Sequence, residues 1–313
     1  MPIPQDFSTP RTPEEKIDSL IHLYIDGGLN RRALMRRLAG LTGGAAAAMA
    51  VLEREGLAQV SQQACPAGIK VDESDKSVQW QDVTFPSGQA KIGAILARPA
   101  GQSSPQPAVI VIHENRGLTD HIRDVTRRAA KAGFVALGVD LLSRQGGSKQ
   151  FTDDQARVAA YGKTVPAERV QDIVAATDYL KKQSFAIGDR IGAVGFCAGG
   201  SNVYASVFQS APLVAGVAFY GTPPNPLPSP DNVKASVLCV FSEKDTNQAA
   251  RIPELTAALV AAHVTFNVVL YKGTAHGFHN DTSPIYDPTA ACDAWGRTIA
   301  WFNTHLRAPR VSA

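Results

Sequence analysis

The feature of this sequence that most restricts its fold is a series of continuous apolar runs from residue 108 onward. The runs read AVIVIH, FVALGVD, RIGAVGF, LVAGVAFY, SVLCVF and TFNVVLY. Short runs without polar alternation are typical of parallel strands that are buried on both faces. Amphipathic stretches separate them, and strands joined by crossover helices form one doubly wound sheet. We therefore predict an α/β fold with a mostly parallel central sheet and helices on both faces.

Two of the intervening stretches have the periodicity of amphipathic helices. HIRDVTRRAAKAG places four apolar side chains on one face, Ile122, Val125, Ala129 and Ala132, and Gly133 follows where a C-cap belongs. PAERVQDIVAATDYLKKQ repeats the pattern with Val170, Ile173, Val174 and Leu180. Upstream of the apolar runs, VQWQDVTF and AKIGAILARP predict a hairpin joined by Pro-Ser-Gly.

The N-terminal region differs from the rest because it shows no strand pattern. Arg31-Arg32 and Arg36-Arg37 precede a weakly apolar segment that ends near Leu52. This order is that of a twin-arginine export signal, and the segment is too short for a membrane span. The alternative is an Ala-rich surface helix that a cytoplasmic protein retains. We therefore predict an arm or signal region over residues 1–67, a catalytic α/β domain over 68–313, and, with a signal, a periplasmic location.

The composition excludes several classes of protein. The formal net charge is +3, and basic residues are interspersed with acidic ones, so no basic stripe suits a nucleic acid. The four cysteines, Cys65, Cys197, Cys239 and Cys292, lie far apart and form no CxxC pair. This argues against a zinc knuckle and a disulfide framework, and it predicts at least one free thiol.

The stretch GFCAGG places Cys197 between a predicted strand and a predicted helix. This is the context of a nucleophile elbow, G-x-Nuc-x-G, in which glycines avoid clashes at a tight turn. The turn would expose the sulfur, and the helix N-terminus would favour the thiolate. The alternative is a buried structural cysteine beside a Gly-rich turn.

Two further residues complete a nucleophile, acid and base in that chain order. Asp245 and His276 each follow a predicted parallel strand, at the sheet edge where α/β proteins build their sites. His276 would exchange protons with the sulfur and the leaving group, while Asp245 would orient the imidazole. Glu243 is the competing acid. His279 suggests a metal pair with His276, but a third ligand is missing and a loop histidine is favoured.

A carboxylate, Glu114, stands at the end of the run AVIVIH, in HENRG. It would repel an attacking thiolate unless it keeps the thiol protonated or takes its proton when substrate arrives.

With H-E-N-R-G, G-F-C-A-G-G and A-H-G-F-H-N in this order, the sequence resembles the dienelactone hydrolase family (carboxymethylenebutenolidase-like) of the α/β-hydrolase fold, from about Val71 to Leu306. It looks closest to a subgroup with a twin-arginine-like N-terminal arm. The resemblance implies that Cys197 is the nucleophile, that Asp245 and His276 complete the triad, and that Glu114 holds the resting thiol and activates it.

The resemblance also implies an oxyanion hole made of the backbone amides of Asn115 and Ala198. The substrate-specific members carry an arginine shortly after the triad histidine, where this chain has Phe278, His279 and Asn280. Arg116 would hold a substrate carboxylate in its place or serve as a salt-bridge partner in its loop.

We therefore expect a cysteine-dependent hydrolase of small-molecule esters or lactones that needs no cofactor and no metal, with a homo-oligomer possible. The alternatives are a binding protein on a hydrolase scaffold and a thiol redox protein. The intact Cys-Asp-His order counts against the first. The second lacks a nearby resolving cysteine, because Cys239 falls inside a predicted strand.

Overall fold

The computed structural model describes residues 12–13, 16–17, 20, 31–54 and 70–307. The chain divides into two compact units, Met1–Gln63 and Ala64–Ala313. In the first unit, α2 (Arg31–Thr42) and α3 (Ala45–Arg54) pack through an apolar cluster of Ile17, Leu34, Leu38, Ala48 and Leu52. None of the helices in these described ranges is long and apolar enough to cross a membrane. The expected boundary near residue 67, and Cys65, lie outside the described residues.

The second unit is built on an eight-stranded sheet in the order β1-β2-β4-β3-β5-β6-β7-β8. Its strands are β1 (Val78–Ser87), β2 (Ala90–Pro99), β3 (Gln106–Ile112), β4 (Val135–Val139), β5 (Ala186–Phe196), β6 (Ala215–Phe219), β7 (Ser236–Ser242) and β8 (Phe266–Tyr271). The β1–β2 and β2–β4 pairs are antiparallel, and all other pairs are parallel. The predicted strands are thus confirmed.

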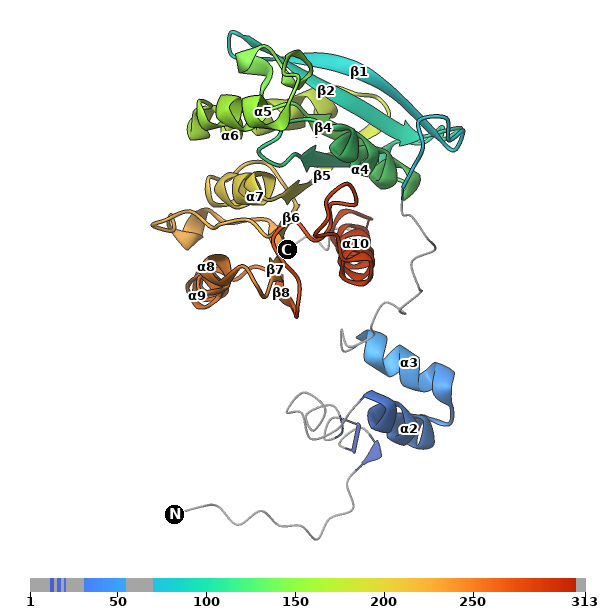
Figure 1. Ribbon diagram of the computed structural model, residues 1–313. Coiled ribbons are helices and arrows are strands. Elements are labelled where there is room, and N and C mark those ends of the chain that lie inside the picture. The colour runs from blue at the N-terminus through green and yellow to red at the C-terminus, as the bar shows by residue number, and fades with distance from the viewer. Residues whose placement is uncertain (1–11, 14–15, 18–19, 21–30, 55–69, 308–313) are drawn as a thin grey trace. The chain divides into compact units, whose positions relative to one another are not determined.

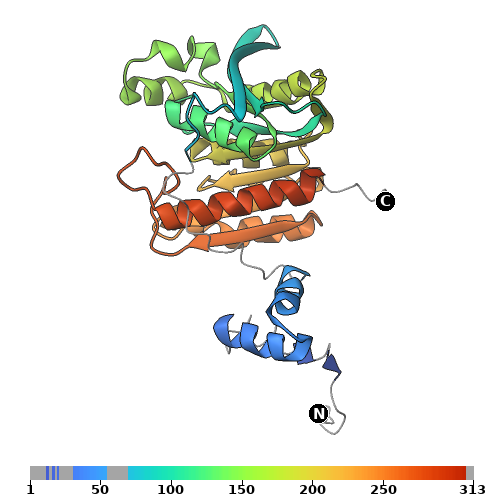
Figure 2. The same cartoon turned by 90° about the vertical axis from the view of Figure 1, so that its right-hand side faces the viewer.

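Helices cover both faces of the sheet (Figure 1). They are α4 (Asp120–Lys131), α5 (Asp154–Gly162), α6 (Pro166–Lys181), α7 (Ala198–Phe208), α8 (Thr246–Ala249), α9 (Ile252–Ala261) and α10 (Pro288–Phe302), with short helical turns at Ser143–Gln145, Ser148–Gln150, Pro230–Asn232 and Asn303–Arg307. Figure 2 shows α10 lying across one face of the sheet. The predicted doubly wound arrangement is therefore confirmed.

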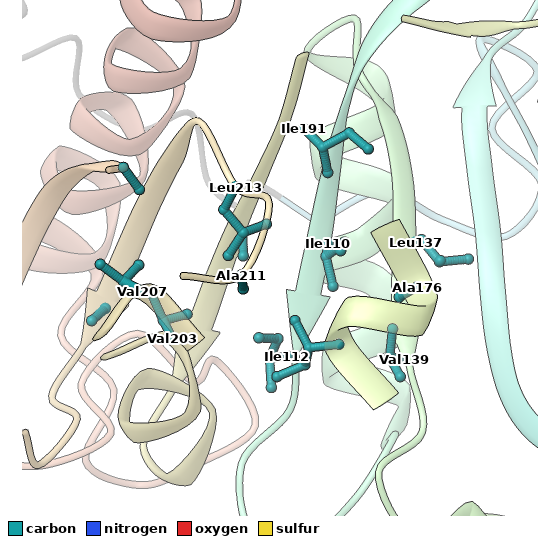
Figure 3. Packing of buried hydrophobic residues seen from close by; sticks show 14 of the residues in the cluster. Ile110, Ile112, Leu137, Val139, Ala176, Ile191, Val203, Val207, Ala211 and Leu213 are labelled. Atoms are coloured by element: carbon teal, nitrogen blue, oxygen red, sulfur yellow. The ribbon is translucent and has the colours of Figure 1, made fainter. Parts of the chain in front are cut away.

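Each face of the sheet has its own hydrophobic core. Ile110, Ile112 and Leu137 belong to the core on the α6 and α7 side, which also contains Ala176, Val203 and Val207 (Figure 3). The opposite core includes Val109, Val111, Ile122, Val125 and Trp295 from β3, α4 and α10. Alternate residues of β3 thus face opposite cores, which explains why its sequence is apolar throughout.

The sequence predicts a turn between β1 and β2 and a glycine cap after α4. The β1–β2 hairpin forms, but β1 continues through Pro86 and Ser87, so the turn lies at residues 88–89 rather than at Pro-Ser-Gly. Gly133 follows α4 with φ +96°, a conformation that suits glycine.

The polar side of α4 is not solvated, because Arg128 is buried between Asp124 and Asp281, at 2.5 Å from each carboxylate.

Candidate active site

The predicted elbow lies between β5 and α7. Cys197 has φ +56° and ψ −117°, which is strained for a residue with a side chain and is typical of a nucleophile elbow. A Cβ at Gly195 would lie 2.1 Å from the carbonyl oxygen of Gly199. A Cβ at Gly199 would lie 2.3 Å from the carbonyl oxygen of Ile112. The flanking glycines are therefore required, because the backbone of α7 packs directly against the ends of β3 and β5.

His276 and Asp245 come together at the same edge of the sheet. Asp245 follows β7, His276 follows β8, and Nδ1 of His276 lies 2.5 Å from Oδ2 of Asp245. The competing acid, Glu243, is engaged elsewhere, since its carboxylate accepts a hydrogen bond from the backbone amide of Gly273 at 2.8 Å. Of these two carboxylates, Asp245 is therefore the one that contacts the imidazole of His276.

The protonation of His276 reflects its neighbours. Burial lowers the pKa of His276, but hydrogen bonding to Cys197 and to Asp245, together with their negative charges, raises it to about 9 from an ordinary 6.5. The thiol of Cys197 therefore lies within interaction range of the imidazole.

Glu114 stands at the end of β3 and is only 4% exposed. Its Oε2 accepts a hydrogen bond from Nδ2 of Asn280 at 2.9 Å, and a guanidinium nitrogen of Arg116 lies 3.8 Å away. Its backbone oxygen lies 2.5 Å from Nδ1 of the buried His113. Burial raises the pKa of Tyr220, and the charges of Glu114 and Cys197 raise it further. Glu114 and Cys197 therefore both lie within electrostatic range of the Tyr220 phenol.

The two expected oxyanion amides belong to neighbouring parts of this edge. Asn115 follows Glu114 after β3, and Ala198 opens α7 directly after Cys197. The first amides of a helix have no partner within the helix. Ala198 N–H is thus available to an oxygen beside the sulfur.

A cavity of about 590 Å³ adjoins Glu114, and Trp80, Arg116 and Asn280 also line it. Each arginine or lysine that lines it forms an ion pair with a carboxylate. Arg116 and Arg157 pair with Asp154, and Arg123 and Lys149 pair with Asp82. Arg116 is therefore a salt-bridge partner in this structure, whatever else it binds.

The family model described as "Dienelactone hydrolase family" matches residues 92–306, which is more than half of the chain. The chain belongs to this family. A protein of Methylorubrum extorquens named for carboxymethylenebutenolidase activity is 34% identical over 235 residues, which cover 72% of this chain and 80% of that protein. A similarly named protein of Yersinia pestis is 30% identical, over 72% of this chain and 88% of that protein.

Solved structures agree with the family assignment. A Klebsiella pneumoniae protein described as a dienelactone hydrolase has a TM-score of 0.65 and 28% identity, over 72% of this chain and 98% of that one. A dienelactone hydrolase-like promiscuous phosphotriesterase from metagenomic libraries has a TM-score of 0.64 and 26% identity, over 73% and 99%. The protein is thus a hydrolase of ester or lactone bonds with the α/β-hydrolase fold.

Phe278, His279 and Asn280 stand where the resemblance implies an arginine in the substrate-specific members, and Phe278 is fully buried. Asn280 binds Glu114, as described above. His279 is fully buried, and its ring stacks on Phe196 at 4.9 Å between ring centroids. Burial holds the pKa of His279 well below its usual range. No group of three or more metal-binding side chains occurs among the described residues, and His279 belongs to the core.

Sequence reasoning missed a polar group near the sulfur. Asn202 of α7 donates to the Tyr161 hydroxyl of α5 at 2.9 Å and accepts from Nε of Arg169 at 3.1 Å. Burial raises the pKa of Tyr161, as does the charge of Cys197, so this phenol lies near the sulfur. Nothing in the local sequence links α5 to the elbow, and only the tertiary fold reveals this neighbour.

The cysteines divide into free and bonded ones. Cys197 and Cys239 are free, so the expected free thiol is confirmed. Cys239 is fully buried in β7, and burial raises its pKa to about 12. Cys292, in α10, is disulfide-bonded. The sequence argues against a disulfide framework, and one bonded cysteine does not contradict that expectation.

Proposed function

We propose that this protein hydrolyses carboxylic esters or lactones through an acyl-enzyme on Cys197. The observation that carries the proposal is the His276–Asp245 pair beside a cysteine on a strained elbow. Once Glu114 has taken the thiol proton, the sulfur forms a bond to the carbonyl carbon, the bond to the leaving group breaks, and the departing alkoxide takes a proton from His276. Water then gives a proton to His276 and attacks the thioester, which releases the acid and the thiolate, and the proton held by Glu114 returns to the sulfur. The amides of Asn115 and Ala198 stabilise the oxyanion in both steps.

The change in charge on the sulfur switches the role of His276. Once Cys197 is ionised, the thiolate helps to raise the pKa of His276 to about 9, so an imidazolium is available to protonate the leaving group. Acylation removes that negative charge and with it two of the causes that raise the pKa. The imidazole then becomes neutral and can act as the base for water.

A titration of His276 tests this coupling. By NMR, the His276 ring of the wild type should titrate near pH 9, and in Cys197→Ala at lower pH, because the thiolate is absent. The pKa of His276 is higher in the folded than in the unfolded chain, so protonated His276 stabilises the fold. This contribution to the free energy of unfolding is complete below about pH 6.5 and disappears as the pH rises through about 9. Identical titrations in the two proteins would show that the sulfur does not interact with His276.

We propose that Glu114 controls the protonation of Cys197, keeping the resting thiol protonated and taking its proton when substrate binds. Its burial, and its position near the phenol of Tyr220 that also senses Cys197, support this role.

We also propose that neutral esters are accepted about as well as carboxylated lactones. The 590 Å³ cavity adjoins Glu114 but is not lined by Cys197 or His276, and its arginines and lysine are paired with carboxylates. A substrate carboxylate that extends from the sulfur past Glu114 would meet no unpaired arginine or lysine among the described residues there, and burying an unpaired carboxylate is costly. We expect kcat/KM for dienelactone to exceed that for a neutral ester of similar size only modestly. Arg116→Ala should lower the ratio of these two kcat/KM values. A preference of about 10³, or roughly 4 kcal/mol, would show that a cation is free to bind the substrate.

We propose that the N-terminal region directs export to the periplasm. The twin arginines, Arg31 and Arg32, stand at the start of α2. Cys292 is disulfide-bonded, and disulfides form and persist mainly in oxidising compartments such as the periplasm. Fractionation of cells should place the wild type in the periplasm, and a variant with Arg31→Lys and Arg32→Lys in the cytoplasm. Full-length wild-type protein found in the cytoplasm alone would instead support a retained arm.

The two rival functions are a binding protein and a thiol redox protein. Release of p-nitrophenol from p-nitrophenyl acetate by the wild type, compared with a Cys197 variant, separates them from the hydrolase. Burial of Cys239 inside β7 counts against its use as a resolving thiol.

A further inference from the structure

The side chain of Asn280 has a defined orientation. Its Oδ1 accepts hydrogen bonds from the backbone amide of Thr282 at 3.0 Å and from the Thr282 hydroxyl at 2.7 Å. A backbone amide can only donate, so the Asn280 atom that faces it must be the oxygen. The amide nitrogen therefore faces Glu114, and the bond between them runs from Nδ2 to the carboxylate.

The loop around Asn280 is held on both sides. The backbone amide of Asn280 donates to the carbonyl oxygen of Gly277 at 2.9 Å. The next residue, Asp281, pairs with Arg128 at 2.5 Å and with His121 at 2.9 Å. Burial raises the pKa of Asp281, but these partners lower it well below its usual value. Asn280 itself is only 3% exposed, so its side chain has little freedom to turn away from Glu114.

Glu114 depends on this single amide. Among the described residues, Asn280 is the one side chain that donates a hydrogen bond to its carboxylate. Arg116 stays at 3.8 Å, and its other terminal nitrogen lies nearer to Asp154, at 3.2 Å. A donor to a buried carboxylate favours the ionised form. A neutral amide binds a carboxylate less strongly than a guanidinium does, so it can hold Glu114 and still release it.

We propose that Asn280, oriented by Thr282, is the positioning residue that keeps the Glu114 carboxylate aimed as a proton acceptor for its exchange with Cys197. The loop that carries His276 thus also prepares the second acid–base group. This inference rests on the role proposed above for Glu114.

The decisive variant is Asn280→Asp, which keeps the size of the side chain and its contact with Thr282 but replaces the donor by a carboxylate. The introduced carboxylate and that of Glu114 would then lie side by side and keep a shared proton to higher pH. In a plot of the single-turnover acylation rate against pH, we expect the acid limb to move up by about one pH unit. On the acid side of this limb the acylation rate should fall by up to about tenfold, with KM changed less than about threefold. A merely structural role would lower the rate at every pH and leave the limb in place.

Glu114→Gln, alone and combined with Asn280→Asp, separates the two proposals. If Glu114→Gln acylates like the wild type, the proposed role of Glu114 fails, and this inference with it. If Glu114→Gln is slow but Asn280→Asp keeps the wild-type limb, only this inference is overturned. The inference is also overturned if the double variant still shows the shifted acid limb, because Asn280 is proposed to act only through the Glu114 carboxylate, which that variant lacks.

A second variant, Asn280→Ala, serves if Asn280→Asp does not fold. A loss of about tenfold in acylation that disappears in the Glu114→Gln background would support the inference. Acylation equal to that of the wild type would overturn it. Thr282→Val, which keeps the Glu114 contact but removes the hydroxyl that orients Asn280, should show a smaller loss in the same direction.

Discussion

Replacement of Cys197 by alanine is expected to lower the turnover of p-nitrophenyl acetate by about 10³-fold or more, the usual consequence of removing a covalent nucleophile. The fold should survive, because the side chain is partly exposed at the elbow and contributes little to the core. Steady-state rates and thermal unfolding of the two proteins measure both effects. Cys197→Ser should retain little activity, since a hydroxyl is a much weaker acid than a thiol.

The matched control is Cys239→Ala, which removes the other free thiol. Cys239 is fully buried in β7, so its loss should cost stability but leave turnover within about threefold of the wild type. Turnover by Cys197→Ala within about tenfold of the wild type would overturn the covalent mechanism. Equal losses in the two cysteine variants would point to a structural role for both.

The sheet and the positions of Cys197, Asp245 and His276 at its edge could be predicted because the evidence for each is local. A strand buried on both faces leaves a continuous apolar run, and the elbow at Cys197 needs glycines beside it. Asp245 and His276 are recognisable because each directly follows such a run. Parallel strands bring these ends to one edge, so chain order alone places the three residues together.

The partners of these residues could not be predicted, because each comes from a distant part of the chain. Asn280 binds Glu114 across 166 residues, and Arg128 binds Asp281 across 153. The charged side of α4 resembles a solvated face in the sequence, yet it is buried because those pairs compensate the cost of burying charge. Sequence left open whether Arg116 binds substrate or a neighbour, and only the fold shows Asp154 beside it.

The assignment of the acid leads to the second large effect. Asp245→Asn should lower kcat/KM by about 10³ to 10⁴-fold, because an amide stabilises neither the imidazolium nor the tautomer that places the proton on Nδ1. The effect should be this large because Oδ2 of Asp245 lies 2.5 Å from Nδ1 of His276. Gln248, whose Nε2 is 3.4 Å from the same nitrogen, is too distant and carries no charge to replace the carboxylate.

Glu243→Gln is the control for this assignment, since it makes the same chemical change only two residues away. Its carboxylate binds the backbone amide of Gly273 and lies on the surface, so we expect kcat/KM within about threefold of the wild type. Measured at one pH, the two variants distinguish the two acids without any change in size at either position. A greater loss in Glu243→Gln than in Asp245→Asn would mean that the loop after β7 rearranges when substrate binds and brings Glu243 to the imidazole.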